Sequence, residues 1–97
     1  MLPLFALTAC TQAHQPTREE ARLASQEIIK QNLMSPGYIR FSNEGEMSID
    51  ELAPGRFRVR GFVDYQGQSG TAIRTNYTCV LLYGARGRWE VQDLKWE

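Results

Sequence analysis

The feature that most constrains this chain is an alternation of mostly apolar and mostly polar side chains in its second half. From residue 57 to 65 the odd positions are Phe, Val, Gly, Val and Tyr, and the even positions are Arg, Arg, Phe and Asp. After a glycine-rich loop at 66–70, a similar alternation runs from 71 to 83. Because successive side chains of a strand point to opposite faces, this period of two predicts a long antiparallel hairpin with one buried face.

Three further segments have the composition of strands and complete the expected sheet. Tyr38–Ser42 and Met47–Leu52 precede the long hairpin, and Trp89–Trp96 follows it after a second glycine-rich loop. In the last segment the apolar phase slips between Val91 and Leu94. Such a slip predicts either a β-bulge or a strand that is buried on both faces.

A helix is predicted before the first strand. Thr17-Arg-Glu-Glu20 fits a capping box, in which the threonine hydroxyl and the glutamate carboxylate each accept from the other's backbone amide. No Gly or Pro follows until Ser35-Pro36-Gly37, which ends the helix near Met34. Apolar side chains at helical spacing form the expected buried stripe: Ala21, Ala24, Ile28, Ile29 and Leu33, widened by Leu23.

These elements predict one α+β domain, with an N-terminal helix packed on one face of a four- to five-stranded antiparallel meander sheet. The length of 97 residues and the apolar fraction of 42% suit a single globular domain. Gly61, in the middle of a long strand, permits a kink, so that the sheet can curve around the helix. A helix held in a curved sheet resembles the cystatin-like fold.

The N-terminal sequence carries a different kind of signal. Leu7-Thr8-Ala9-Cys10 follows an uncharged apolar run and resembles the lipobox of bacterial lipoproteins. The resemblance implies cleavage before Cys10, a diacylglycerol on its sulfur, and membrane attachment through acyl chains such as palmitate. It divides the chain into a signal peptide at 1–9, a lipid-anchored tether at 10–16 and a folded domain at 17–97.

Two details bear on this assignment. Signal peptides begin with a basic segment, whereas no Lys or Arg precedes Arg18, so we expect translation to start upstream of Met1. In lipoproteins of this kind an Asp after the modified cysteine favours the inner membrane. Thr11 stands there instead, which by resemblance indicates the periplasmic face of the outer membrane. The alternative is a cytosolic small binding domain without lipid, in which Cys10 is an ordinary thiol.

A second resemblance covers the hairpin. The segments Gly61–Gln66 and Gly70–Cys79 resemble a recurring motif of small bacterial and phage proteins, with Val-Asp-x-Gln followed by Gly, Arg and an aromatic-Thr-Cys sequence. The resemblance extends over residues 35–97 and implies a helix followed by a curved sheet, in proteins mostly without an assigned function. Gly67 and Ser69 depart from the motif, which favours Asn and an aromatic residue there, so we expect a different loop conformation.

Charge is distributed unevenly along the chain, although the formal net charge is zero. Residues 1–52 hold four basic and seven acidic side chains, and residues 53–97 hold seven basic and four acidic ones. Four arginines and one phenylalanine share the outward face of the predicted sheet: Arg56, Arg58, Arg60, Phe62 and Arg74. Because arginine and aromatic residues are enriched in interfaces, we expect this face to bind an acidic envelope protein, an anionic glycan or phospholipid headgroups. A chain without net positive charge is not expected to bind nucleic acid.

No set of side chains in the sequence predicts catalysis, a metal site or a bound cofactor. His14, the single histidine, lies in the tether, where it has no fixed geometry. Cys79 lies on the apolar face of a strand, as a buried thiol or in an intermolecular disulfide. Asp64 and Arg74 fall on adjacent strands, which favours a cross-strand ion pair. A hydrolase that uses Asp64 as an acid would require a closed pocket and a raised pKa.

The loop Gln66–Gly70 offers a second function. Its flanking Gln and Gly match the inhibitory hairpin of cystatins, Gln-x-Val-x-Gly, although Gln68 replaces the apolar residue of that motif. We therefore expect an interaction or structural module of the cell envelope rather than an enzyme. An inhibitor of an envelope enzyme, acting through this hairpin loop, is the alternative.

Overall fold

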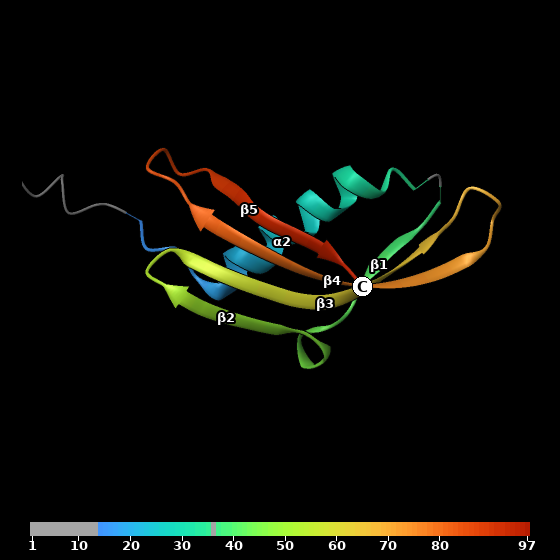
Figure 1. The fold of residues 1–97 in the computed structure, drawn as a ribbon, viewed down its shortest axis with the longest axis horizontal. Coiled ribbons are helices and arrows are strands. Elements are labelled where there is room, and N and C mark those ends of the chain that lie inside the picture. The colour runs from blue at the N-terminus through green and yellow to red at the C-terminus, as the bar shows by residue number, and fades with distance from the viewer. Residues whose placement is uncertain (1–13, 36) are drawn as a thin grey trace, which may run out of the picture.

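A computed structural model describes residues 14–35 and 37–97, and it confirms the predicted α+β arrangement of a helix on an antiparallel meander sheet. This part of the chain contains one α-helix, one 3₁₀ helix and five strands (Figure 1). In chain order the elements are α2 (Arg18–Leu33), β1 (Ile39–Phe41), η2 (Glu44–Glu46), β2 (Ser48–Ala53), β3 (Arg56–Gln66), β4 (Ala72–Tyr83) and β5 (Trp89–Trp96). The predicted strand bounds differ from the observed ones by no more than one residue.

The ends of α2 follow from local sequence. At the N-terminus the Glu20 amide donates to Oγ1 of Thr17 at 3.2 Å, and the Thr17 amide donates to Oε1 of Glu20 at 2.9 Å, which completes the predicted capping box. At the C-terminus Met34 has a left-handed conformation with φ 50°, and its amide donates to the Lys30 carbonyl at 3.4 Å. The helix therefore begins and ends where the sequence predicts.

The buried stripe of α2 differs from the predicted one at two positions. Ala21, Ser25 and Ile29 are fully buried, whereas Leu23, a predicted member, is 49% exposed. With 3.6 residues per turn, Leu23 lies about 200° around the helix from Ala21 and so falls off the stripe. Ser25 tolerates burial because its hydroxyl donates to the Arg22 carbonyl at 2.7 Å, which satisfies the polar group within the helix.

Strand β3 organises the sheet. It pairs with β4 along its whole length. On its other side, β2 pairs with residues 56–60 and β1 with residues 63–65, so two short strands share one edge end to end. Strand β5 pairs with the free side of β4 and lies at the edge of the sheet (Figure 1).

The slip of the apolar phase in β5 is a β-bulge, one of the two predicted alternatives. Val80 pairs with Asp93 and Leu81 pairs with Val91, so Gln92 is an extra residue without an opposite residue on β4. A bulge shifts the side-chain phase of a strand by one residue. As a result, the apolar side chains before and after the bulge lie on the same face of the sheet.

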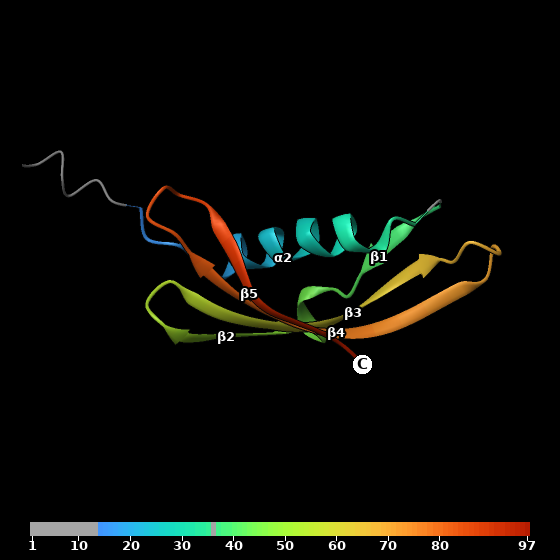
Figure 2. The same cartoon turned by 45° about the horizontal axis from the view of Figure 1, so that its top comes forward.

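The core lies between α2 and the concave face of the curved sheet (Figure 2). The helix packs against β2, β3 and β4. The buried apolar side chains come from the helix and from the odd positions of the long hairpin: Ala21, Ile29, Phe57, Val59, Val63, Tyr77, Cys79 and Leu81. The alternation that predicts the hairpin therefore also predicts which of its faces is buried.

Gly61 makes room for the largest buried side chain. It pairs with Tyr77 of β4, whose ring is fully buried. A Cβ atom at Gly61 would lie 2.7 Å from Oγ of Ser42 and 3.4 Å from the Tyr77 hydroxyl. The glycine thus permits close packing between β3, the Tyr77 ring and the segment after β1, in addition to the curvature expected from sequence.

The Tyr77 hydroxyl is buried without a hydrogen-bond partner among the described residues. Burial raises the pKa of this phenol to about 12, although the nearby Ser25 side chain acts in the opposite direction. An unsatisfied buried hydroxyl costs roughly 1–3 kcal/mol of stability. The aromatic ring fills the core, and we expect its hydroxyl to cost stability there because no partner meets it with hydrogen-bond geometry among the described residues.

Replacing Tyr77 with phenylalanine removes the hydroxyl and keeps the ring that covers Gly61. We expect the free energy of unfolding of Tyr77→Phe, measured by urea denaturation, to rise by about 1 kcal/mol. Tyr65→Phe is the control and should not gain stability, because the Tyr65 hydroxyl lies 3.4 Å from Oγ1 of Thr75 and has that partner to lose. A fall in the stability of Tyr77→Phe would show that the hydroxyl is satisfied, for instance by a buried water.

Candidate functional site

The five residues of the predicted partner face lie on the face of the sheet opposite α2: Arg56, Arg58, Arg60, Phe62 and Arg74. This face is the convex side of the curved sheet (Figure 2). The first four occupy alternate positions of β3, and Arg74 comes from the paired strand β4. The intervening odd positions of β3 face α2. We call these five residues the arginine face.

Acidic and amide side chains hold the arginines of this face in place. Nη2 of Arg58 lies 3.1 Å from Oδ2 of Asp50, and Nη2 of Arg60 lies 3.6 Å from the same oxygen. Asp50 stands on β2 directly opposite Arg58, so one carboxylate is shared by two guanidinium groups. Nε of Arg56 donates to Oε1 of Gln92 on β5 at 2.9 Å. The face is therefore a network of paired groups rather than a set of isolated cations.

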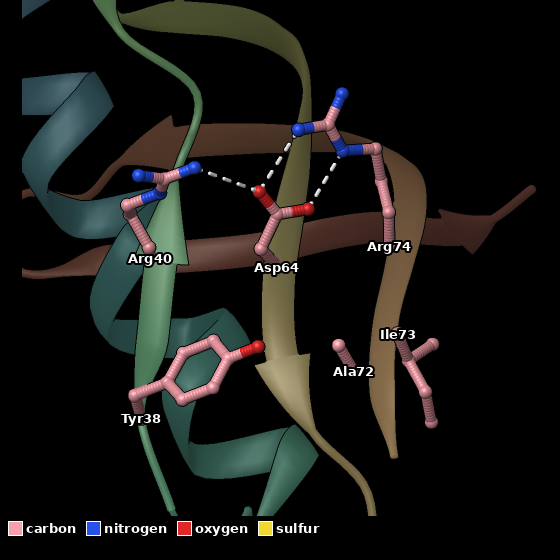
Figure 3. Close-up of a pocket in the computed structure, with 6 residues that line it drawn as sticks. All are labelled: Tyr38, Arg40, Asp64, Ala72, Ile73 and Arg74. Atoms are coloured by element: carbon pink, nitrogen blue, oxygen red, sulfur yellow. Dashed lines mark hydrogen bonds and ion pairs between the residues drawn. The ribbon is translucent and has the colours of Figure 1, made fainter.

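A second carboxylate, Asp64, lies between two guanidinium groups at one end of the arginine face (Figure 3). Arg74 donates from Nε to Oδ1 at 2.7 Å and from Nη2 to Oδ2 at 2.9 Å, which makes a bidentate pair. From the other side, Nη2 of Arg40 on β1 lies 3.5 Å from Oδ2. The predicted cross-strand ion pair of Asp64 and Arg74 is confirmed, and Arg40 extends it to a third strand.

The protonation state of Asp64 follows from these contacts. The hydrogen bonds from Arg74 lower the pKa of Asp64 below the usual aspartate value, and Arg40 adds to this effect, whereas burial acts in the opposite direction. The carboxylate is therefore ionised at neutral pH and serves as an acceptor that orients both arginines. The hydrolase hypothesis requires a raised pKa at this position, and the lowered pKa of Asp64 is contrary to that requirement.

Aromatic and apolar side chains line the hollows around this cluster. The guanidinium carbon of Arg74 lies 3.8 Å from the centre of the Phe62 ring, a cation–π contact. The pocket in Figure 3 has a volume of about 430 Å³ and is lined by Tyr38, Arg40, Asp64, Ala72, Ile73 and Arg74. A smaller pocket of about 240 Å³ shares both arginines and reaches Phe62. The site thus combines fixed guanidinium donors with ring surfaces.

Three of the charged and aromatic residues of this site were not predicted from the sequence. Tyr38 and Arg40 lie beside and within the short strand β1, and Asp50 lies on β2. The apolar residues at 39 and 41 indicate that Arg40 faces outward, but no local pattern shows which residue of β3 stands opposite. The pairing of β1 and β2 with β3 supplies that information.

The other candidate groups lie apart from the arginine face. Cys79 is a free thiol that is fully buried in the core, and burial raises its pKa to about 11. The predicted burial of Cys79 is thus confirmed. Nε2 of His14 lies 2.7 Å from Oε2 of Glu20, and its ring packs edge-on against Tyr83, so His14 contacts the domain.

Within the described residues no cluster of three His, Cys, Asp or Glu side chains could hold a metal ion.

The loop Gln66–Gly70 connects β3 to β4 at one end of the molecule (Figure 1). The Gly67 amide donates to the Thr71 carbonyl at 2.8 Å, and Gly70 has a positive φ of 88°. Gln68 and Ser69 are exposed. The position that an apolar residue occupies in the cystatin hairpin is thus filled by a solvated polar side chain.

Cys10 and the other lipobox residues lie outside the described part of the chain. In the part that is described, no helix combines the length and the apolar composition needed to cross a membrane.

No protein-family model matches the sequence, and comparisons with curated proteins and with solved structures find no significant match.

The geometry around Asp64 predicts a titration that depends on Arg74. By NMR, the Asp64 carboxyl carbon should titrate with a midpoint below the ordinary aspartate pKa of about 3.9, and Arg74→Gln should move the midpoint upward. Because the pKa is lower in the folded state, the pair stabilises the fold above the unfolded-state pKa, and this contribution is lost as pH falls through the folded-state pKa. Arg88→Gln, in the loop before β5, is the control and should leave the midpoint unchanged. An Asp64 titration midpoint that is unchanged in Arg74→Gln would contradict the ion pair of Asp64 and Arg74.

Proposed function

We propose that this protein is a lipid-anchored binding module of a bacterial cell envelope, and that its arginine face captures acidic segments of a partner protein. The observation that carries the proposal is the fixed orientation of the arginines by two carboxylates, Asp50 and Asp64. The proposal assigns the domain a binding role and no catalytic step.

Oriented arginines favour binding because less side-chain entropy is lost when a partner arrives. Arg74 uses Nε and Nη2 for Asp64, and its remaining nitrogen points away from the carboxylate (Figure 3). Arg40 makes one long contact with Asp64, and 77% of its side chain is exposed. A partner carboxylate would therefore meet donors that are already positioned. The ordering cost, roughly 0.5–1.5 kcal/mol for a mobile side chain, is reduced.

The mixture of charges favours a protein partner over a continuous anionic surface. Basic side chains are in excess on the convex face, but Asp50, Asp64 and Asp93 lie among them. These carboxylates would repel a uniformly anionic membrane or glycan, and they would attract basic side chains of a protein partner. Phe62 and Tyr38 add aromatic surface of the kind enriched in protein interfaces.

The envelope location rests on the lipobox sequence Leu7-Thr8-Ala9-Cys10. A lipid on Cys10 would hold the domain next to a membrane and would restrict it to partners in the same compartment. Tethering raises the effective concentration of such partners. An anchored domain can therefore function with the modest affinity that a partly neutralised arginine face provides.

Binding at the arginine face is tested with a fluorescent peptide that is rich in Asp and Glu and contains aromatic residues. Arg58→Gln/Arg60→Gln should weaken binding about tenfold, since each lost surface charge contact is worth roughly 0.2–1 kcal/mol. The affinity of the unmodified protein should also fall as salt concentration rises.

The matched control is Arg86→Gln/Arg88→Gln, which removes the same charge from the loop before β5. This variant should keep the affinity of the unmodified protein within about twofold. An equal loss in both double variants would show that net charge governs binding, and an unchanged affinity of Arg58→Gln/Arg60→Gln would remove this face from the proposal. Thermal unfolding of each variant checks that the fold is retained.

The anchor is tested by mass spectrometry of protein purified from bacterial membranes after expression from its own gene. We expect the mature chain to begin at Cys10 and to carry diacylglycerol or three acyl chains on that residue. Cys10→Ser should abolish the mass increase and release the protein from the membrane fraction. The Cys79 peptide serves as the internal control and should be unmodified, because its thiol is buried. An intact Met1 with an unmodified Cys10 would favour the cytosolic alternative.

A further inference from the structure

Strand β5 is an edge strand with a free row of backbone donors and acceptors. It is the last strand on one side of the sheet and pairs only with β4. Its other side pairs with no strand within residues 14–35 and 37–97 (Figure 1). The strand is eight residues long, with the sequence WEVQDLKW. Exposed edges of this length are templates for pairing with another strand.

The concave side of β5 is apolar and incompletely covered. The main contacts of α2 are with β2, β3 and β4. Val91 and Trp96 pair with the buried residues Leu81 and Tyr77 of β4, yet they are 43% and 40% exposed. A strand placed beside β5 would cover part of this apolar surface.

The bulge at Gln92 gives β5 a symmetric order of side chains. Apolar residues lie on the concave face both before and after the bulge: Trp89, Val91, Leu94 and Trp96. Glu90, Asp93 and Lys95 pair with outward residues of β4 and lie on the convex face. Read from either end, the strand presents an aromatic residue, a charge and an aliphatic residue.

We propose that β5 pairs antiparallel with β5 of a second copy of this chain, with Gln92 opposite Asp93. The pairs in this register are Trp89 with Trp96, Glu90 with Lys95, Val91 with Leu94, and Gln92 with Asp93. Two-fold symmetry repeats each pair once. Aromatic, aliphatic and oppositely charged residues therefore each meet a complementary residue.

The bulge is what makes this register possible. Opposite residues in an antiparallel pair share a face of the sheet. Glu90 and Lys95 are an odd number of positions apart, so in a regular strand they would point to opposite faces. The bulge shifts the phase between them and places both on the convex face. The two-fold axis then stands perpendicular to the sheet, and both α2 helices lie on the same side of one continuous sheet.

The charges of β5 select this register against its neighbours. Sliding one copy by two residues puts Glu90 opposite Asp93 in one direction and opposite Glu97 in the other. Like charges directly opposite each other destabilise a strand pair. Charged residues on an edge commonly prevent strand association, but here they are compatible with one alignment of two identical strands.

The test is sedimentation velocity of the full chain over a range of concentrations, for the unmodified protein and for Glu90→Lys and Lys95→Glu. The unmodified protein should dimerise with increasing concentration. Each single variant places like charges opposite each other twice per dimer, so its dimer dissociation constant should rise about tenfold. Glu90→Lys/Lys95→Glu restores opposite charges and should recover the original constant within about threefold.

A mixture of the two single variants gives a second readout. Each variant supplies the charge that the other lacks, so differently tagged copies should form mixed dimers in preference to either homodimer. Because such rescue requires both variants to be folded, it excludes unfolding as the cause of dimer loss. Glu51→Lys on β2 makes the same charge change at the opposite side of the sheet and should leave the constant unchanged. A monomer at all concentrations, single variants that dimerise normally, or a mixture without preference would each overturn the proposal.

Discussion

The pairing of β3 with β4 is the constraint on which the rest of the structure depends. Its register sends the odd positions of both strands toward α2 and the even positions to the convex face. The same register sets Asp64 opposite Arg74, so the bidentate ion pair is a direct consequence of strand pairing. The outer strands add to the two sides of this hairpin and bring Arg40, Asp50 and Gln92 to arginines and carboxylates that are already in position.

Features that depend on neighbouring residues could be predicted from the sequence. The capping box of Thr17 and Glu20, the alternation of the hairpin and the phase slip in β5 are all local patterns, and each is observed. Leu23 was assigned to the core wrongly because apolar character does not reveal which side of a helix meets a sheet. Arg40 and Asp50 were missed because each stands opposite a residue of a strand that is distant in the sequence. The sequence of one strand alone does not determine which residues of the two strands stand opposite each other.

Two surfaces with different chemistry result from this architecture. The convex face carries the charged side chains, and Asp50 and Asp64 neutralise part of its positive charge while they orient the guanidinium groups. The partly exposed apolar side chains of β5, Val91 and Trp96, lie on the concave face instead. Separation of this kind would allow the convex face to recognise a partner through charge while the β5 edge associates through backbone pairing and apolar contact.

The two proposals reinforce each other through symmetry. A two-fold axis perpendicular to the sheet leaves each face of the sheet on its own side, so the arginine faces of two paired copies lie on one shared convex surface. A partner with repeated acidic segments could then contact both faces at once, and the second contact would be intramolecular. Under this proposed arrangement a modest affinity of each partly neutralised face would be an advantage, because binding would respond to the number of acidic segments in the partner. The bulge at Gln92 is an irregularity of one residue in an edge strand. In this arrangement it would determine whether the two arginine faces of a dimer point to the same side of the sheet.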